Sequence, residues 1–93
     1  MNMLINTVCG NGLGSSLILK INVDKILKEL GIDAQVEAKD VGSVPSSDAE
    51  LFVTTTQFKP NLENLEKNII YVNNVMDKDV LREQLEDYFS NRS

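Results

Sequence analysis

The chain has 93 residues, 25% of them charged, and a formal net charge of −5. This acidic balance argues against binding to nucleic acid, whose phosphates require clustered lysine and arginine side chains. The sequence contains no histidine and one cysteine, which excludes Cys–His nucleophile pairs, serine triads, zinc sites and an internal disulfide.

The first half of the chain predicts a strand, a long helix and a second strand. Residues 3–8 are apolar enough for a buried strand, and residues 13–30 keep apolar side chains at helical spacing. Gly31 is placed to end that helix as a left-handed C-terminal cap. Residues 34–38 alternate between apolar and polar side chains, which is typical of a strand. The glycine, serine and proline of residues 41–48 predict a loop.

The second half predicts two more strands and two more helices. Residues 51–55 are rich in β-branched side chains and predict a third strand. A short helix over residues 61–66 follows Pro60, and the apolar residues 69–72 predict a fourth, buried strand. Asp77 is a candidate N-cap for a last helix that ends near residue 89.

This order of elements predicts a single α/β domain over residues 1–93. Four strands separated by helical or long connections imply right-handed crossovers, and therefore a parallel sheet with helices on both faces in three layers. Ligands bind such sheets at the carboxyl ends of the strands. Cys9 directly follows the first predicted strand and therefore lies at that edge.

The chain shows no sign of a membrane or export segment. No apolar run approaches the length of a membrane span, and residues 1–7 lack the basic segment and apolar core of a secretory signal. A lone cysteine fits the reducing cytoplasm. We therefore expect a cytoplasmic protein with no direct membrane insertion, no metal and no organic cofactor.

A glycine-rich segment joins the first predicted strand to the first predicted helix. Its residues are Cys9, Gly10, Asn11, Gly12, Leu13, Gly14, Ser15 and Ser16. The glycines let backbone N–H groups approach an anion closely, and the serine and asparagine side chains add donors. A helix N-terminus also carries unpaired N–H groups and a partial positive charge. We interpret the segment as a phosphate loop, with Cys9 shifted toward the thiolate and ready to accept a phosphoryl group.

The loop fits three better-known kinds of segment less well. A buried, inert cysteine before a tight turn would explain Cys9 alone, but not the three glycines and two serines that follow it. A nucleotide-hydrolysing P-loop would need a lysine after Gly14, which is missing. Gly10, Gly12 and Ser15 approach a dinucleotide motif, but the chain has a single such half and no room for a substrate domain. A small phosphate- or nucleotide-binding module that uses the loop passively stays open as the alternative.

The loop also differs from that of cysteine phosphatases in one position. The low-molecular-weight tyrosine phosphatases place an arginine six positions after the cysteine, where this chain has Ser15. The two arginines of this sequence, Arg82 and Arg92, lie in the C-terminal segment. Without a guanidinium on the equatorial oxygens, hydrolysis loses its main electrostatic support. A phosphocysteine would then form but hydrolyse slowly, as a phosphoryl carrier requires.

The segment from Val8 to Ser16, together with Ile18, Lys20 and Val23-Asp24, resembles the IIB component of the bacterial phosphoenolpyruvate-dependent sugar phosphotransferase system. The resemblance is strongest to the ascorbate type, which is related to the galactitol and lactose types. It implies a phosphatase-like, Rossmann-like sheet with strand order 2-1-3-4 and a phosphate loop over residues 10–16. It also implies that this protein is a protein-phosphocysteine sugar phosphotransferase.

The resemblance further implies two protein partners. Cys9 would accept phosphate from the phosphohistidine of a IIA protein. It would then pass the phosphate to a sugar, ascorbate or a related carbohydrate, that is bound by the membrane IIC permease. The identity of the sugar does not follow from this sequence, because the membrane component mainly sets it.

Two further sets of side chains lie near the loop. Leu13, Leu17 and Ile21 are spaced by four along the first helix, opposite its main apolar stripe. Either a neighbouring loop covers them or they form an exposed docking surface for the IIA partner. We predict that at least two of them are exposed. In the strand order 2-1-3-4 the third strand lies beside the first, so Thr55 or Thr56 could approach the loop from the side. Threonine also simply suits strands, and we leave Thr54, Thr55 and Thr56 outside the candidate site.

Overall fold

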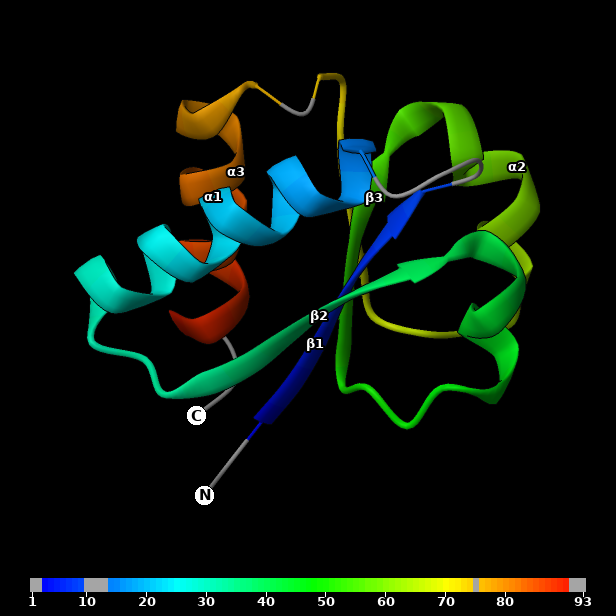
Figure 1. The fold of residues 1–93 in the computed structure, drawn as a ribbon, viewed down its shortest axis with the longest axis horizontal. Helices are drawn as coiled ribbons and strands as arrows, with labels where there is room; N and C mark the ends of the chain where they lie inside the picture. The colour runs from blue at the N-terminus through cyan, green and yellow to red at the C-terminus, as the bar shows by residue number, and fades with distance from the viewer. Residues whose placement is uncertain (1–2, 10–13, 75, 91–93) are drawn as a thin grey trace.

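The computed structural model describes residues 3–9, 14–74 and 76–90. Four parallel strands form a sheet in the order β2-β1-β3-β4 (Figure 1). The strands are β1 (Met3–Cys9), β2 (Ala34–Asp40), β3 (Leu51–Thr55) and β4 (Ile69–Val72). Ile5 of β1 pairs with Val36 of β2 on one side and with Leu51 of β3 on the other. The predicted parallel sheet and its strand order are therefore confirmed.

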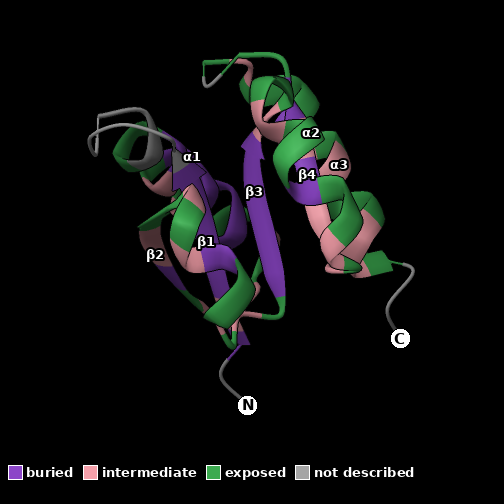
Figure 2. Ribbon diagram, turned by 90° about the vertical axis from the view of Figure 1, so that its right-hand side faces the viewer, coloured by how far each residue is buried: buried purple, intermediate pink, exposed green. Residues whose placement is uncertain are grey.

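Helices cover both faces of the sheet, as predicted. The helices α1 (Gly14–Leu30) and α3 (Lys78–Ser90) cover one face (Figure 1). The short elements η1 (Val41–Ser46), η2 (Thr56–Phe58), α2 (Lys59–Leu62) and η3 (Glu63–Leu65) cover the other (Figure 2). Each face has its own core cluster, so the sheet separates two hydrophobic layers.

Burial explains the apolar character of the central strands. Strand β3 is covered on both faces, and residues 51–54 are all buried (Figure 2). On α1 the main apolar stripe includes Leu19, Val23 and Leu27, which are at most 2% exposed. Each such side chain stabilises the fold by about 1.5–3 kcal/mol relative to an exposed position. This stripe holds α1 against the sheet and thereby sets the position of its N-terminus relative to the strands.

The end of α1 and the start of α3 are defined by backbone hydrogen bonds. Gly31 has a φ of 73°, which confirms the predicted left-handed cap of α1. The Gly31 amide donates to the Lys28 carbonyl at 3.2 Å and the Ile32 amide to the Leu27 carbonyl at 2.9 Å, which is the Schellman pattern. Helix α3 begins directly after Asp77, whose carbonyl accepts a bond from the Leu81 amide at 3.1 Å.

Two local predictions were inaccurate. The segment predicted as a loop over residues 41–48 forms η1, because Val44 is buried against the sheet and anchors a turn of helix there. The helix predicted after Pro60 begins earlier, at Lys59, because proline is tolerated in a first helical turn.

The outer strand β2 carries a row of polar side chains. Gln35 donates from Nε2 to Glu37 Oε2 at 2.8 Å, and Lys39 Nζ lies 3.6 Å from Glu37 Oε1. These three side chains alternate along the strand and therefore lie on one face of it. In the described part of the chain, no helix is both long enough and apolar enough to cross a membrane.

Candidate functional site

The candidate nucleophile lies where the sequence predicted it. Cys9 is the last residue of β1 and pairs with Asp40, the last residue of β2, so it lies at the carboxyl edge of the sheet. Helix α1 begins at Gly14, at the same end of the sheet (Figure 1). The predicted loop residues Gly10, Asn11, Gly12 and Leu13 lie outside the described residues. The described residues that flank the loop in sequence are Cys9 and Gly14.

The first turn of α1 supplies the remaining predicted loop residues. Gly14, Ser15 and Ser16 form that turn, and it contains no acidic residue. The partial positive charge of the helix N-terminus is therefore not offset by a carboxylate of its own first turn. This end of a 17-residue helix has the electrostatics that favour an anion.

Arg82, on α3, is held far from this helix end. Its guanidinium pairs with Glu29 near the end of α1, and its Nε donates to Glu86 at 3.1 Å. Glu29 follows Gly14 by 15 residues, which corresponds to about 22 Å along the helix axis. Arg82 therefore does not replace the phosphatase arginine. The second arginine, Arg92, lies outside the described residues.

A buried hydroxyl that lies outside the predicted site contacts the end of β1. Thr54 of β3 is fully buried, and its Oγ1 donates to the Val8 carbonyl at 3.0 Å. Val8 is the residue directly before Cys9. The strand order 2-1-3-4, which puts β3 beside β1, pointed to Thr55 or Thr56, and the structure shows that the neighbouring Thr54 makes the contact with the end of β1.

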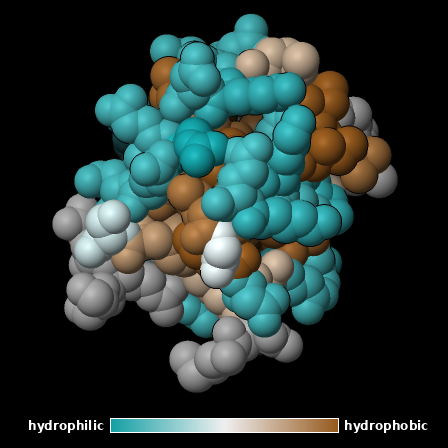
Figure 3. Space-filling model, turned by 90° about the vertical axis from the view of Figure 1, so that its left-hand side faces the viewer, coloured by the Kyte–Doolittle hydropathy of each residue, from teal (hydrophilic) through white to brown (hydrophobic). Residues whose placement is uncertain are grey.

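An exposed apolar surface lies on α1 close to its start. Leu17, Ile18 and Ile21, which we call the α1 patch, are 46%, 39% and 63% exposed. Figure 3 shows hydrophobic side chains gathered along one edge of the face that α1 and α3 cover. The prediction that at least two of Leu13, Leu17 and Ile21 are exposed is confirmed by Leu17 and Ile21, and Leu13 lies outside the described residues.

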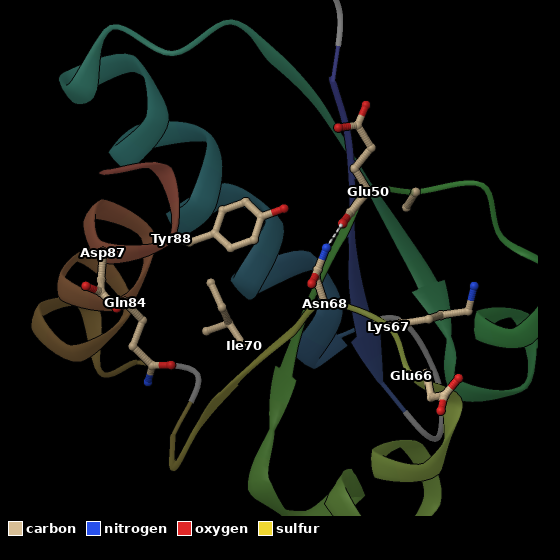
Figure 4. A pocket seen from close by; sticks show the side chains of 9 residues that line it. Glu50, Glu66, Lys67, Asn68, Ile70, Gln84, Asp87 and Tyr88 are labelled. Atoms are coloured by element: carbon tan, nitrogen blue, oxygen red, sulfur yellow. Dashed lines mark hydrogen bonds between the residues drawn. The ribbon is translucent and has the colours of Figure 1, made fainter. Parts of the chain in front are cut away.

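A separate open hollow lies at the opposite end of the sheet (Figure 4). Glu50 and Asn68, which precede β3 and β4, line it, and Asn68 Nδ2 donates to the Glu50 carbonyl at 3.3 Å. Tyr88 closes it from α3 (Figure 4). Because this hollow is at the amino ends of the strands and Cys9 is at the carboxyl edge, it is not part of the candidate phosphate site.

Comparison with known sequences identifies one family. The family described as "PTS system, Lactose/Cellobiose specific IIB subunit" matches residues 4–87. The "Ascorbate-specific PTS system EIIB component" of Mycoplasma pneumoniae is 37% identical over 90 residues, which cover 90% of this chain and 92% of that protein. The protein of the same name from Escherichia coli O157:H7 is 41% identical over 58 residues, which cover 60% of this chain and 57% of that protein.

Comparison with solved structures agrees on the fold. The lactose-specific IIB component domain of the phosphoenolpyruvate:carbohydrate phosphotransferase system from Streptococcus pneumoniae superposes with a TM-score of 0.69. The alignment covers 100% of both chains at 12% sequence identity. At that identity the likeness establishes the arrangement of strands and helices and nothing about ligands.

Proposed function

Because this chain belongs to the lactose/cellobiose-specific IIB subunit family of the phosphotransferase system, we propose that Cys9 is the residue that carries the phosphoryl group. The observation that carries the proposal is the position of Cys9 at the end of β1, with the N-terminus of α1 at the same edge of the sheet. A thiol in that position is stabilised as a thiolate, which is the nucleophilic form. The family assignment also agrees with the resemblance found in the sequence.

The proposed reaction has two transfer steps. In the first, the Cys9 thiolate attacks the phosphorus of a phosphohistidine on the IIA protein; the S–P bond forms, the N–P bond breaks, and the histidine keeps the nitrogen lone pair. In the second, a sugar hydroxyl at the membrane IIC permease attacks the same phosphorus and loses its proton, and Cys9 leaves as thiolate. Backbone amides of residues 10–16 and the hydroxyls of Ser15 and Ser16 would stabilise the phosphoryl oxygens in both steps.

The proposed carrier differs from a phosphatase because it must protect its phosphocysteine from water. Arg82 is paired with Glu29 and Glu86, away from the start of α1. Within the described residues, hydrolysis therefore lacks the guanidinium that supports it in cysteine phosphatases. We further infer a cytoplasmic location, where the thiol stays reduced, and ascorbate or a related carbohydrate as the sugar, since the two relatives above bear that name.

Intact-mass spectrometry tests the proposed function directly. The full chain is incubated with phosphoenolpyruvate, the general phosphotransferase proteins and a IIA protein, and its mass is measured under denaturing conditions. A carrier gains the mass of one phosphoryl group. The alternative, a module that binds phosphate or a nucleotide passively, gains none, because a non-covalent ligand is lost on denaturation. Omitting the IIA protein is the control for uncatalysed modification.

The thiol of Cys9 is expected to be more acidic than a free cysteine. The α1 N-terminus and the loop amides stabilise the thiolate, so the pKa of Cys9 should fall below the ordinary value of about 8.5. The rate of alkylation by iodoacetamide, measured against pH, gives the midpoint. The sequence contains no second cysteine to obscure it. A midpoint at or above the free value would contradict this electrostatic activation.

We also propose that the α1 patch is the contact surface for the IIA protein. Phosphoryl transfer brings Cys9 against a histidine of the partner, so the contact must surround the loop. The α1 patch is exposed and lies in the first two turns of α1, which begins at the loop. Transient complexes use modest surfaces of this kind. Its three apolar side chains are therefore available to be covered when the partner binds.

A charge in the α1 patch is expected to weaken this docking. Docking can bury only the exposed half of the Leu17 side chain, which contributes about 0.7–1.4 kcal/mol, so Leu17→Asp should slow phosphate transfer from IIA by roughly threefold to tenfold at limiting protein concentration. The alkylation midpoint of Cys9 and the circular dichroism spectrum should stay nearly unchanged. Val80→Asp, the same kind of change at an exposed apolar position on α3, is the matched control. Equal transfer rates for both variants would place the docking surface elsewhere.

A further inference from the structure

We propose that Thr54 is a positioning residue that fixes the Val8–Cys9 peptide, and thereby the direction in which the Cys9 side chain leaves β1. The proposal rests on the proposed function of Cys9. Its basis is the hydrogen bond from the fully buried Thr54 Oγ1 to the Val8 carbonyl, at 3.0 Å. Thr54 does not touch the phosphoryl group in this proposal; it acts through the backbone.

The bond lies where the pairing between β1 and β3 ends. The paired residues of the two strands run from Ile5 and Leu51 to Thr7 and Val53. One further step of the same register brings Val8 beside Thr54. At this position the side-chain hydroxyl of Thr54 bonds the Val8 carbonyl. On the other side of β1 the pairing with β2 continues to Cys9 and Asp40. The end of β1 is therefore held from the β3 side by a side-chain hydroxyl.

Fixing the Val8 carbonyl also fixes the backbone N–H and Cα of Cys9. The Val8 carbonyl and the Cys9 amide belong to one planar peptide unit. Orienting the carbonyl therefore sets the direction of the Cys9 N–H and the position of the Cys9 Cα. The bond is shielded from solvent, since Val8 is 1% exposed and Thr54 is fully buried. Without the hydroxyl, the buried Val8 carbonyl would lose its partner on the β3 side, and the end of β1 would be held only by its pairing with β2.

Replacing the hydroxyl by a methyl group tests the proposal. Thr54→Val keeps the shape of the side chain but removes the donor. We expect phosphoryl transfer to Cys9 to slow by about tenfold to a hundredfold, because misplacement by about 1 Å costs rate on that scale. We also expect the alkylation midpoint of Cys9 to rise toward that of free cysteine, because the thiolate moves relative to the α1 N-terminus. Thr54→Ser, which restores the donor, should return both values close to those of the natural chain.

Two control variants separate positioning from loss of stability. Thr55→Val makes the same change at the next position of β3, whose side chain is directed to the opposite face of the sheet. Val53→Ala weakens the buried core of β3 without touching the Val8 carbonyl. Neither control should move the alkylation midpoint. A midpoint that rises as much in Val53→Ala as in Thr54→Val would overturn the proposal.

Two further outcomes would contradict the positioning role of Thr54. A folded Thr54→Val protein that alkylates and accepts phosphate like the natural chain contradicts the proposal. If Thr54→Val does not fold, Thr54→Ala takes its place; if neither folds while Thr54→Ser does, the hydroxyl determines the fold and the proposal fails. Alkylation requires no phosphate. A natural chain that gains no phosphoryl group therefore rejects the proposed function alone, and the midpoints still decide the role of Thr54.

Discussion

Replacing Cys9 by serine is expected to abolish covalent phosphorylation of the chain. A serine hydroxyl at this position is un-ionised near neutral pH and has no histidine to activate it as a general base, since the sequence contains none. The absence of histidine also removes the other residue that phosphotransferase proteins use as a carrier. The mass spectrum of Cys9→Ser, after incubation with phosphoenolpyruvate and the upstream proteins, should show the unmodified mass alone.

This substitution also tells a carrier from a passive binding module. Serine differs from cysteine by one atom and keeps the glycine loop, so non-covalent binding of inorganic phosphate should survive in Cys9→Ser. Isothermal titration calorimetry with inorganic phosphate measures that binding in both proteins. Phosphorylation that persists in Cys9→Ser would show that another side chain accepts the phosphoryl group, and the assignment of Cys9 would be rejected.

Truncating Phe52 is expected to produce the largest loss of stability among single core substitutions on the η1 side of the sheet. Phe52 is 1% exposed and packs with Val8, Val44 and Leu62 in the core cluster on that side. A buried Phe→Ala change costs about 3–5 kcal/mol, and a domain of this size has about 5–15 kcal/mol in total. The free energy of unfolding falls by about 1–3 kcal/mol for each molar increase in urea. The urea concentration at the unfolding midpoint should therefore fall by at least about 1 M.

Phe58 provides the matched control for this measurement. It packs against the same cluster but is only partly buried, at the end of η2. Phe58→Ala therefore leaves a smaller cavity and should cost less than half as much. Similar midpoints for the two variants would mean that the cluster relaxes to fill the space, and that the sheet tolerates repacking on this side.

The fold could be predicted from the sequence because its signals are local and mutually consistent. Four apolar or alternating segments, separated by helical or long connections, indicate a parallel sheet. Gly31 marks the end of α1, where it adopts a positive φ. Strand β3 and strand β4 have the predicted bounds. The errors fell on η1 and α2, where burial of single side chains such as Val44 and Leu62 decides the structure. Composition alone carries little information about such contacts.

The candidate site was predictable in part for the same reason. Cys9 and the glycine-rich loop form a continuous motif, so the nucleophile and the helix N-terminus could be found by reading along the chain. Thr54 is 45 residues away from Cys9 in sequence, and its residue type is common in strands. Its contact with Val8 depends on strand order and register, which bring β3 beside β1. The expected strand order put the third strand beside the first, but the register that brings Thr54, rather than Thr55 or Thr56, to the Val8 carbonyl is known only from the structure.

The polar row on β2 has a consequence for the protein at high concentration. An outer strand leaves backbone donors and acceptors open to another chain, and a flat apolar edge would invite sheets to join and aggregate. Gln35, Glu37 and Lys39 place an amide, a carboxylate and an ammonium group along β2. A second copy that paired there would have to desolvate these groups. We therefore expect the chain to resist joining another sheet through its β2 edge.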